Sequence, residues 1–548
     1  MHRTFKIVSI SLLCAIFFSS PATAQTEADK LAEAMVEHLS CYPLELVTLG
    51  STKPTLIERD LCLAAIYHET GVRPLWVTEE GPGAPAETAL QYLKNSNREG
   101  LEPADYQIEQ LERLWQNRSV ASLARLDTLL TYNVVKYVHD VSFGRLQPYM
   151  VNPELFAEAG EKLFDPVAII RDIQAASNLD QYFQELPPDN SHYEGLKAGL
   201  TWYRYLQQAG EWPAIEGGKN LYQADRDSRI PQIRKRLALL LGKSANFEAE
   251  DFYDLALEED VLLFQELHGL KSDGVIGRMT LAELNVTPAE RVDQIVINMA
   301  RWRWQSRNPG KEYVLVNIAN FQLYGYREGQ LQLSLPVIVG KLQHQTPVFS
   351  DHISYVEFHP FWNIPPSIAM NEELPRLRKN PFALVEKNIR LFSSWQADAV
   401  ELDSTTIDWN SVGRSQMARY KLRQDPGPNN ALGRVKFVFP NHYSVYIHDT
   451  PAKDLFREKH RFFSHGCIRV SDPGRFAAFV LQGSMPEMDE SRIEELMTAE
   501  TRRIVRVTPP LAIHLTYQTA WLDKDGRIHF NRDIYGRDEK LRQALLSR

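Results

Sequence analysis

The sequence predicts a multidomain α+β protein with a helical first part, a small three-helix module and a mainly antiparallel β domain that carries a helical insertion. Three observations support this fold class. The chain has 548 residues, which suggests roughly three or four domains of about 150 residues each. Apolar residues recur at helical spacing before residue 308 and alternate with polar residues from residue 313 onwards. Hydrophobic residues form 44% of the chain, so large cores can form.

The charge of the chain narrows the class of partner. The formal net charge is −9 at pH 7, and the sequence contains no long basic run. Nucleic acid and anionic membrane surfaces are therefore poor candidates as partners. An acidic substrate would have to be bound by local arginines, because the field of the whole protein would repel it.

The first 24 residues have the pattern of a secretory signal. Arg3 and Lys6 precede an apolar run over residues 7–18. This run is shorter than a membrane-spanning helix requires. Residues 22–24 read Ala-Thr-Ala, a small-residue cleavage site. We expect export with cleavage after residue 24, and an uncleaved membrane anchor is the alternative.

Residues 25–224 are expected to form a helical scaffold domain. The segments 28–39 and 122–139 show apolar residues at helical spacing. No nucleophile stands beside a base in this part of the sequence. The pattern alone therefore indicates a helical domain without chemistry of its own.

Residues 225–290 are expected to form the three-helix module, followed by a linker helix within 291–312. Helical spacing covers 230–241 and 255–267, and a short third helix begins at Thr280. Glycines between the second and third helices set the geometry of the turn, and leucines fill a core. Packing alone explains each of these residues.

The β domain is expected over residues 313–535, with a tail at 536–548. Polar and apolar residues alternate along 313–318, 321–326 and 331–339. Residues 367–424 interrupt this pattern with a helical, charged stretch. Because this insertion lies between two strands that lead to the reactive stretch described below, it is a candidate lid.

The reactive stretch, residues 441–470, contains the histidine and the cysteine that we single out, His448 and Cys467, with 18 residues between them. His448 ends a predicted strand over 443–447, and Cys467 follows Gly466 on a turn of small residues. A thiolate is the nucleophilic form of cysteine, and a nearby imidazole can generate it and later protonate a leaving amine. Backbone can approach a substrate closely at Gly466, so its amides could face an oxyanion. The pattern indicates acyl transfer through a thioester.

The cysteines outside the signal are Cys41, Cys62 and Cys467. Export would place them in an oxidising compartment. Because Cys41 and Cys62 lie close in sequence, we predict that they form a disulfide and that Cys467 stays reduced. The alternative is that Cys41 and Cys62 are two separate buried thiols.

The reactive stretch resembles the signature of the L,D-transpeptidase catalytic domain. The resemblance rests on His448, a gap of 15 residues, and the run Ser464-His465-Gly466-Cys467-Ile468-Arg469. It implies that Cys467 is the nucleophile and that His448 is the general base, oriented through the carbonyl of Asp449. It also implies that His465 is the second motif histidine beside the cysteine, and that Arg469 contributes to substrate binding or to the structure of the site.

The rest of the chain resembles the large multidomain L,D-transpeptidases of Gram-negative bacteria. Residues 25–224 resemble their N-terminal scaffold, residues 225–290 resemble peptidoglycan-binding domains, and the insertion resembles a capping subdomain. The residues expected to bind substrate, besides Arg469, are Ser464, Gly466, Trp362, Tyr420 and Arg423. Core packing would explain the two aromatic residues equally well.

The function implied by this resemblance is the cross-linking of periplasmic peptidoglycan. Cys467 would attack the peptide bond after the third residue, diaminopimelate, of a tetrapeptide stem, and D-alanine would leave. The side-chain amine of a second stem would resolve the thioester. Cell-wall synthases are candidate partners, carbapenems are the expected inhibitors, and no metal or organic cofactor is implied. The alternatives are an L,D-carboxypeptidase, a lipoprotein-anchoring transpeptidase and a non-catalytic wall-binding scaffold.

A metal centre is the other chemical interpretation of the reactive stretch. Four histidines and the cysteine lie close together in sequence, at positions 442, 448, 460, 465 and 467. Their spacing does not form a tight ligand pair such as H-x-x-x-H or C-x-x-C. Acyl transfer is therefore the preferred interpretation.

Overall fold

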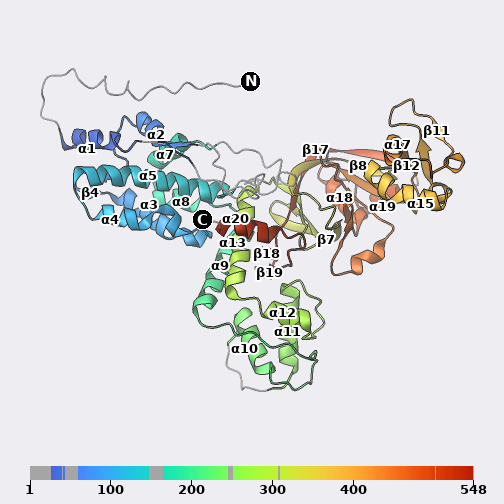
Figure 1. The fold of residues 1–548 in the computed structure, drawn as a ribbon, viewed down its shortest axis with the longest axis horizontal. Coiled ribbons are helices and arrows are strands. Elements are labelled where there is room, and N and C mark those ends of the chain that lie inside the picture. The colour runs from blue at the N-terminus through green and yellow to red at the C-terminus, as the bar shows by residue number, and fades with distance from the viewer. Residues whose placement is uncertain are drawn as a thin grey trace. The chain divides into compact units, whose positions relative to one another are not determined.

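The computed structural model of this protein divides into two compact units, which we describe separately (Figure 1). The first unit contains the described residues up to 142 together with 164–187, and the second contains 143–146 and those from 188 onwards. The residues that the structure describes are 26–39, 41–43, 60–146, 164–244, 251–305, 309–499 and 501–546. The predicted signal lies outside them. Within these ranges no helix is long and apolar enough to cross a membrane.

The first unit is mainly helical, as the sequence predicts. Its helices are α1 (Glu27–Val36), α2 (Leu63–Glu69), α3 (Ala84–Lys94), α4 (Ile108–Trp115), α5 (Val120–Phe143), α7 (Pro166–Ala175) and α8 (Leu179–Gln184), with a short hairpin of β3 (Val77–Thr78) and β4 (Gly81–Pro82). The central helix α5 carries the buried Asp127, which accepts hydrogen bonds from the amides of residues 75–77 at 2.7–3.1 Å and from the Tyr67 hydroxyl. Burial raises the pKa of Asp127 to about 6. This carboxyl group fixes the segment that leads into β3 to the helix.

A pair of short strands carries the two cysteines that are predicted to form a disulfide. β1 (Cys41–Pro43) and β2 (Asp60–Cys62) are antiparallel, with Cys41 opposite Cys62. Cys62 is disulfide-bonded. The Cys41 side chain lies outside the described part of the structure, so the pairing of these two cysteines stays a prediction. Cys467 is a free thiol.

In the second unit, two long helices pack against a hairpin from the end of the chain. These elements are α9 (Ser191–Gln208), α13 (Pro288–Trp304), β18 (Ala520–Leu522) and β19 (Ile528–Phe530). Gly195 and Gly199 let the hairpin approach α9 closely, since a Cβ atom at either position would lie 1.9 Å from a side chain of the hairpin. The predicted linker helix is α13, and it begins at Pro288 because Thr287 and Glu290 form a capping box.

Three further helices surround a core of their own. They are α10 (Ile230–Leu240), α11 (Leu255–Leu267) and α12 (Arg278–Leu284). The buried Gln265 holds the turn before α12, because its amide oxygen accepts from the amides of Asp273 and Gly274, each at 3.0 Å. The helices lie where the sequence predicts them, whereas the predicted boundaries at 225 and 290 stay predictions.

A nine-stranded sheet forms the β domain. Its order is β15-β7-β16-β14-β13-β8-β17-β5-β6, and an additional β6–β7 pairing closes it on itself. The strands are β5 (Glu312–Asn317), β6 (Gln322–Arg327), β7 (Gln330–Gly340), β8 (Phe349–Phe358), β13 (Val435–Val438), β14 (Ile447–His448), β15 (Phe462–Ser464), β16 (Ile468–Val470) and β17 (Arg503–Thr516). Most pairs are antiparallel, but β14–β16, β15–β7 and β17–β5 are parallel. The helices α18 (Pro473–Gln482), α19 (Glu490–Thr498) and α20 (Arg537–Leu546) add to its core.

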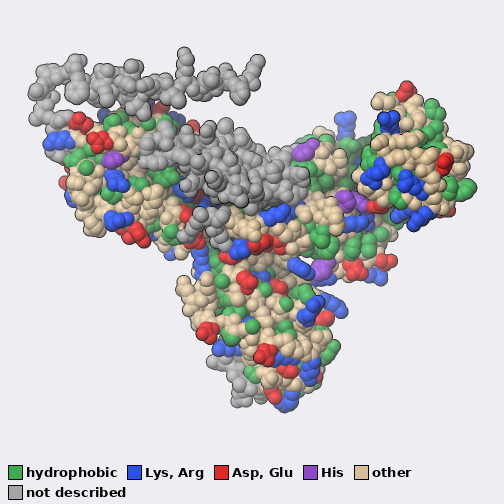
Figure 2. Space-filling view, viewed as in Figure 1, with side chains coloured by type: hydrophobic (Ala, Val, Ile, Leu, Met, Phe, Trp, Pro, Cys, Tyr) green, Lys and Arg blue, Asp and Glu red, His purple; other side chains and the backbone are tan. Residues whose placement is uncertain are grey.

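The insertion is a mixed structure, which corrects the prediction of a helical one. A four-stranded sheet in the order β11-β10-β12-β9 packs with short helices around a separate core. The elements are β9 (Trp362–Ile364), α14 (Pro366–Ile368), η4 (Ala369–Glu373), α15 (Leu374–Lys379), α16 (Ala383–Glu386), β10 (Ile389–Phe392), β11 (Glu401–Leu402), α17 (Arg414–Arg419) and β12 (Lys421–Gln424). Figure 2 shows several Lys and Arg side chains on the face of the insertion in view. The strands have two to four residues each, too short for a clear alternating pattern.

Candidate active site

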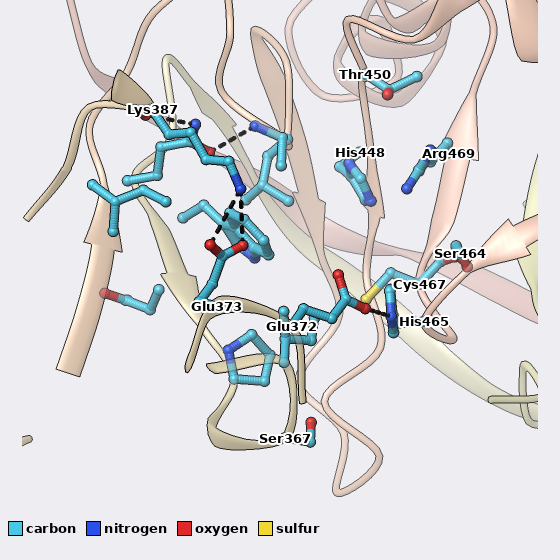
Figure 3. Close-up of a pocket in the computed structure, with 18 of the residues that line it drawn as sticks. Ser367, Glu372, Glu373, Lys387, His448, Thr450, Ser464, His465, Cys467 and Arg469 are labelled. Carbon is cyan, nitrogen blue, oxygen red and sulfur yellow. Dashed lines mark hydrogen bonds and ion pairs between the residues drawn. The ribbon is translucent and has the colours of Figure 1, made fainter. Parts of the chain in front are cut away.

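The strand pairing brings His448 and Cys467 to one face of the sheet. β14 runs parallel to β16, with Ile447 opposite Ile468 and His448 opposite Arg469. Both isoleucines are buried in the main core. Because side chains alternate along a strand, His448 and Arg469 point to the opposite face, and so does Cys467, two residues before Arg469. Figure 3 shows the two strands side by side with these three labelled side chains between them.

The turn before Cys467 is fixed by hydrogen bonds. Gly466 has φ +112, a conformation that favours glycine. The Ser464 hydroxyl accepts from the Gly466 amide at 3.1 Å and donates to the Cys467 carbonyl. The buried Thr346 hydroxyl donates to the Gly466 carbonyl at 2.9 Å and accepts from the Gly340 amide at 2.9 Å. Ser464 therefore shapes the turn, and Thr346 is a support that sequence reasoning missed.

His448 is held as a neutral imidazole. Its side chain is buried, and Nδ1 lies 2.5 Å from the Asp449 carbonyl oxygen. A carbonyl only accepts, so Nδ1 carries the proton and Nε2 presents its lone pair. Burial lowers the pKa of His448 to about 3, and the cations Arg469 and Lys436 act in the same direction. The Asp449 carboxylate itself accepts from Lys453 Nζ at 2.6 Å.

Cys467 is a half-buried thiol. Burial raises its pKa, against the hydrogen bonds of Tyr446 and the nearby cations Lys436 and Arg469, which lower it. Its Sγ atom lies 3.9 Å from the Ser444 carbonyl oxygen. The thiol is thus mostly protonated near neutral pH and needs a base for attack.

A pocket of about 940 Å³ lies over these residues. The predicted site residues that line it are Trp362, His448, Ser464, His465, Cys467 and Arg469. The insertion supplies the opposing wall, which includes Ser367, Glu372 and Glu373 (Figure 3). Lys436, the cross-strand neighbour of His448 on β13, lines the pocket as well.

His465 joins this turn to the insertion. Its Nε2 atom lies 2.5 Å from Glu372 Oε1 on η4. Sequence reasoning placed His465 in the site but missed Glu372 and Lys436. Both come from separate segments, and only the folded register brings them to the pocket.

The structure places two predicted groove residues elsewhere. Tyr420 and Arg423 are not among the residues that line the pocket. Along β12 the side chain of Gln424 faces the pocket, and the alternation of the strand turns Arg423 to the other face, where its guanidinium lies 4.4 Å from the centroid of the Phe361 ring. The Tyr420 ring packs edge-on against Trp409.

The described residues also bear on the metal interpretation. Among them, no group of three or more His, Cys, Asp or Glu side chains could hold a metal ion. The His448 and His465 rings instead bond to the Asp449 carbonyl and the Glu372 carboxylate respectively. Both arrangements orient an imidazole for proton transfer.

The β-rich domain presents a cysteine and a neutral histidine on one face of its sheet. This arrangement is suited to cysteine acyl transfer. Residues 311–490 match the model of the L,D-transpeptidase catalytic domain, and residues 62–200 match the model of a scaffold domain. Residues 311–490 are therefore similar to L,D-transpeptidase catalytic domains, and the preceding residues 62–200 are similar to scaffold domains. The matched ranges are narrower than the predicted 313–535 and 25–224.

One relative and two solved structures are similar to parts of this chain. A Haemophilus influenzae protein that carries the provisional name L,D-transpeptidase is 32% identical over 234 residues, which are 43% of this chain and 46% of the relative. The match therefore spans less than half of that relative's length. An L,D-transpeptidase from Xylanimonas cellulosilytica is 13% identical, over 55% of this chain and 98% of that one, with a TM-score of 0.17. L,D-transpeptidase 3 from Mycobacterium tuberculosis, in complex with a faropenem-derived adduct, is 12% identical over 38% and 60%, with a TM-score of 0.18. These superpositions are poor, so the assignment depends on the sequence matches.

Proposed function

We propose that the protein is a peptidoglycan L,D-transpeptidase that links the third residues of two stem peptides through a thioester on Cys467. The observation that supports this proposal is the shared sheet face of His448 and Cys467, with the imidazole held neutral and its Nε2 lone pair unprotonated. A donor tetrapeptide and an acceptor amine are the substrates. The pocket between sheet and insertion is large enough for a ligand of this size.

The first half-reaction is the acylation of Cys467 by the donor stem. The Cys467 proton passes to His448 Nε2, and sulfur attacks the carbonyl carbon of the third residue of the donor stem. The Gly466 amide already donates to Ser464, so the Cys467 amide is the better donor to the oxyanion. The imidazolium then gives its proton to the leaving D-alanine amine, and Asp449 holds the ring through its carbonyl.

Further proposals concern the other parts of the chain. The three-helix module binds the cell wall, and the insertion acts as a lid, since it forms one wall of the pocket. The exported enzyme works in the periplasm, where its signal would direct it. Arg469 lines the pocket from the sheet and Trp362 lines it from the insertion, and both contact the stem peptide.

A carbapenem tests the nucleophile. Incubation of the purified protein with meropenem should give a covalent adduct by intact mass, and the adduct should be lost in Cys467→Ala. Muropeptide analysis of sacculi treated with the enzyme then identifies the acceptor. Cross-linked dimers support the proposal, shortened stems would indicate a carboxypeptidase, and attached lipoprotein an anchoring enzyme. If the wild-type protein stayed unmodified by meropenem, a non-catalytic wall-binding scaffold would be the remaining interpretation.

A further inference from the structure

The two walls of the pocket carry opposite charges. The sheet contributes Lys436 and Arg469. The insertion contributes three carboxylates and two cations, so a carboxylate is in excess on its wall; these residues are Glu372, Glu373, Glu386, Arg376 and Lys387. An anionic group is attracted to the sheet wall, and a cationic group is attracted to the insertion wall. One substrate of the proposed reaction carries a cationic group, because the acceptor is a primary amine that is an ammonium ion at neutral pH.

Glu372 is the carboxylate on this wall with an imidazole as its partner. Glu373 is paired with Arg376 at 2.8 Å and with Lys387 at 3.0 Å, so its charge is neutralised. Glu372 pairs with His465, whose pKa is lowered chiefly by burial. The imidazole is therefore neutral near pH 7, and Glu372 keeps its negative charge for a ligand.

The pair also has the geometry of an acid–base dyad. His465 Nε2 faces the carboxylate at 2.5 Å, so Nε2 carries the proton and Nδ1 presents a lone pair. A carboxylate in this position orients the ring and stabilises the imidazolium that forms when Nδ1 takes a proton. His465 lies two residues before Cys467 on the same turn, and both side chains line the pocket (Figure 3).

We propose that Glu372 and His465 form the acceptor subsite, which binds a primary ammonium group and deprotonates it for attack on the Cys467 thioester. This inference rests on the proposed function and assigns its second half-reaction. His448, between two cations, serves acylation from the sheet side, and the Glu372–His465 pair serves the acceptor from the insertion side.

The acceptor ammonium gives one proton to His465 Nδ1, and its nitrogen forms a bond to the thioester carbonyl carbon. The tetrahedral intermediate breaks its C–S bond, and sulfur leaves as thiolate. The second proton from nitrogen passes through His448 to that sulfur, which restores the thiol and leaves an amide. The imidazolium of His465 then loses its proton to solvent.

Two nucleophiles of different charge test the proposal. The donor is a tetrapeptide whose diaminopimelate amine is acetylated, so it cannot act as acceptor. The acceptor is either a diaminopimelate-containing tripeptide, which offers an ammonium group, or hydroxylamine, which is uncharged at neutral pH. In Glu372→Gln, transfer to the tripeptide should fall by roughly tenfold or more, while transfer to hydroxylamine and the rate of meropenem acylation stay within about twofold.

Control variants separate this role from a structural one. Glu401 is another insertion carboxylate, paired with Arg390 and absent from the pocket lining, so Glu401→Gln should leave both transfers unchanged. Glu372→Asp keeps the charge and should retain most of the preference for the ammonium acceptor. An equal loss with both nucleophiles, or no loss with either, would overturn the proposal. Failure of the wild type to form a meropenem adduct would instead reject the proposed function.

Discussion

Lys436 Nζ lies 4.0 Å from the centroid of the Tyr446 ring, and Lys436 is also the cross-strand neighbour of His448. The amine is half-buried, and its cross-strand partner on β8 is Glu357, whose carboxylate is paired with Arg502 at 2.7 Å. Its charge lowers the pKa of both Cys467 and His448. Lys436 therefore favours the thiolate and keeps the base neutral at the same time.

The first prediction concerns this lysine. Lys436→Met removes a cation near the sulfur, so the pKa of Cys467 should rise and the thiolate fraction at neutral pH should fall. Alkylation by iodoacetamide, which reports the thiolate, should slow by roughly threefold at pH 7, the scale of one partly screened charge. The pH profile of the alkylation rate should move to higher pH.

Lys421 provides the control, because it lies over the Phe392 ring outside the pocket lining. Lys421→Met should be alkylated at the wild-type rate. A profile that moves to lower pH would contradict the assigned effect.

The second prediction concerns the base. His448→Gln should keep the fold and slow meropenem acylation by ~10²-fold or more, the scale of a lost general base. Intact mass measured over time gives the rate, and circular dichroism checks the fold. Acylation at the wild-type rate would remove His448 from the mechanism.

The depressed pKa of His448 gives a third prediction. Because its pKa is about 3 in the folded state, the base stays neutral well below the ordinary histidine value of about 6.5. The acylation rate should therefore show no acid limb centred near pH 6.5. The contribution of His448 to the free energy of unfolding should be complete above about pH 6.5 and be lost as pH falls towards 3, because the unfolded state binds the additional proton. Denaturant titrations at pH 7 and pH 5 measure the free energy of unfolding of the wild type and of His448→Gln. The change in this free energy between the two pH values should be smaller in the variant.

Several parts of this structure were predictable from the sequence because the interactions are local. His448 and Cys467 lie on a strand and a turn of one short stretch, so their shared face follows from strand alternation and a parallel pair. The partners on other segments were not predictable. Glu372 reaches His465 from the insertion, and the pairing of β13 with β14 decides that Lys436 stands beside His448. Register also decides which way a strand residue points, and for this reason Arg423 faces away from the pocket.

A fourth prediction concerns the first unit. Asp127→Ala leaves the amides of residues 75–77 without their side-chain acceptor and removes one of the two partners of the buried Tyr67 hydroxyl, which keeps Thr131 Oγ1. We expect the first unit to lose about 3 kcal/mol or more of its stability, since several buried donors lose one charged partner. Hydrogen exchange of the amides of residues 75–77 should accelerate most. Glu109 lies exposed on α4, and Glu109→Ala should change stability by less than about 0.5 kcal/mol.

The last prediction concerns the support beneath the catalytic turn. The Thr346 hydroxyl bridges the Gly340 amide and the Gly466 carbonyl, and the residue is fully buried. Thr346→Val keeps the volume but leaves both backbone groups unpaired, so stability should fall by about 1–3 kcal/mol. Because Gly466 adjoins Cys467 and holds φ +112, the loosened turn should also slow meropenem acylation. Thermal unfolding and intact mass measure the two effects.

Thr498 provides the control, because its hydroxyl also bonds to a backbone carbonyl but lies on the exposed face of α19. Thr498→Val should change neither the stability nor the acylation rate. A Thr346→Val variant that loses stability yet acylates at the wild-type rate would show that this bridge holds the fold without positioning the sulfur.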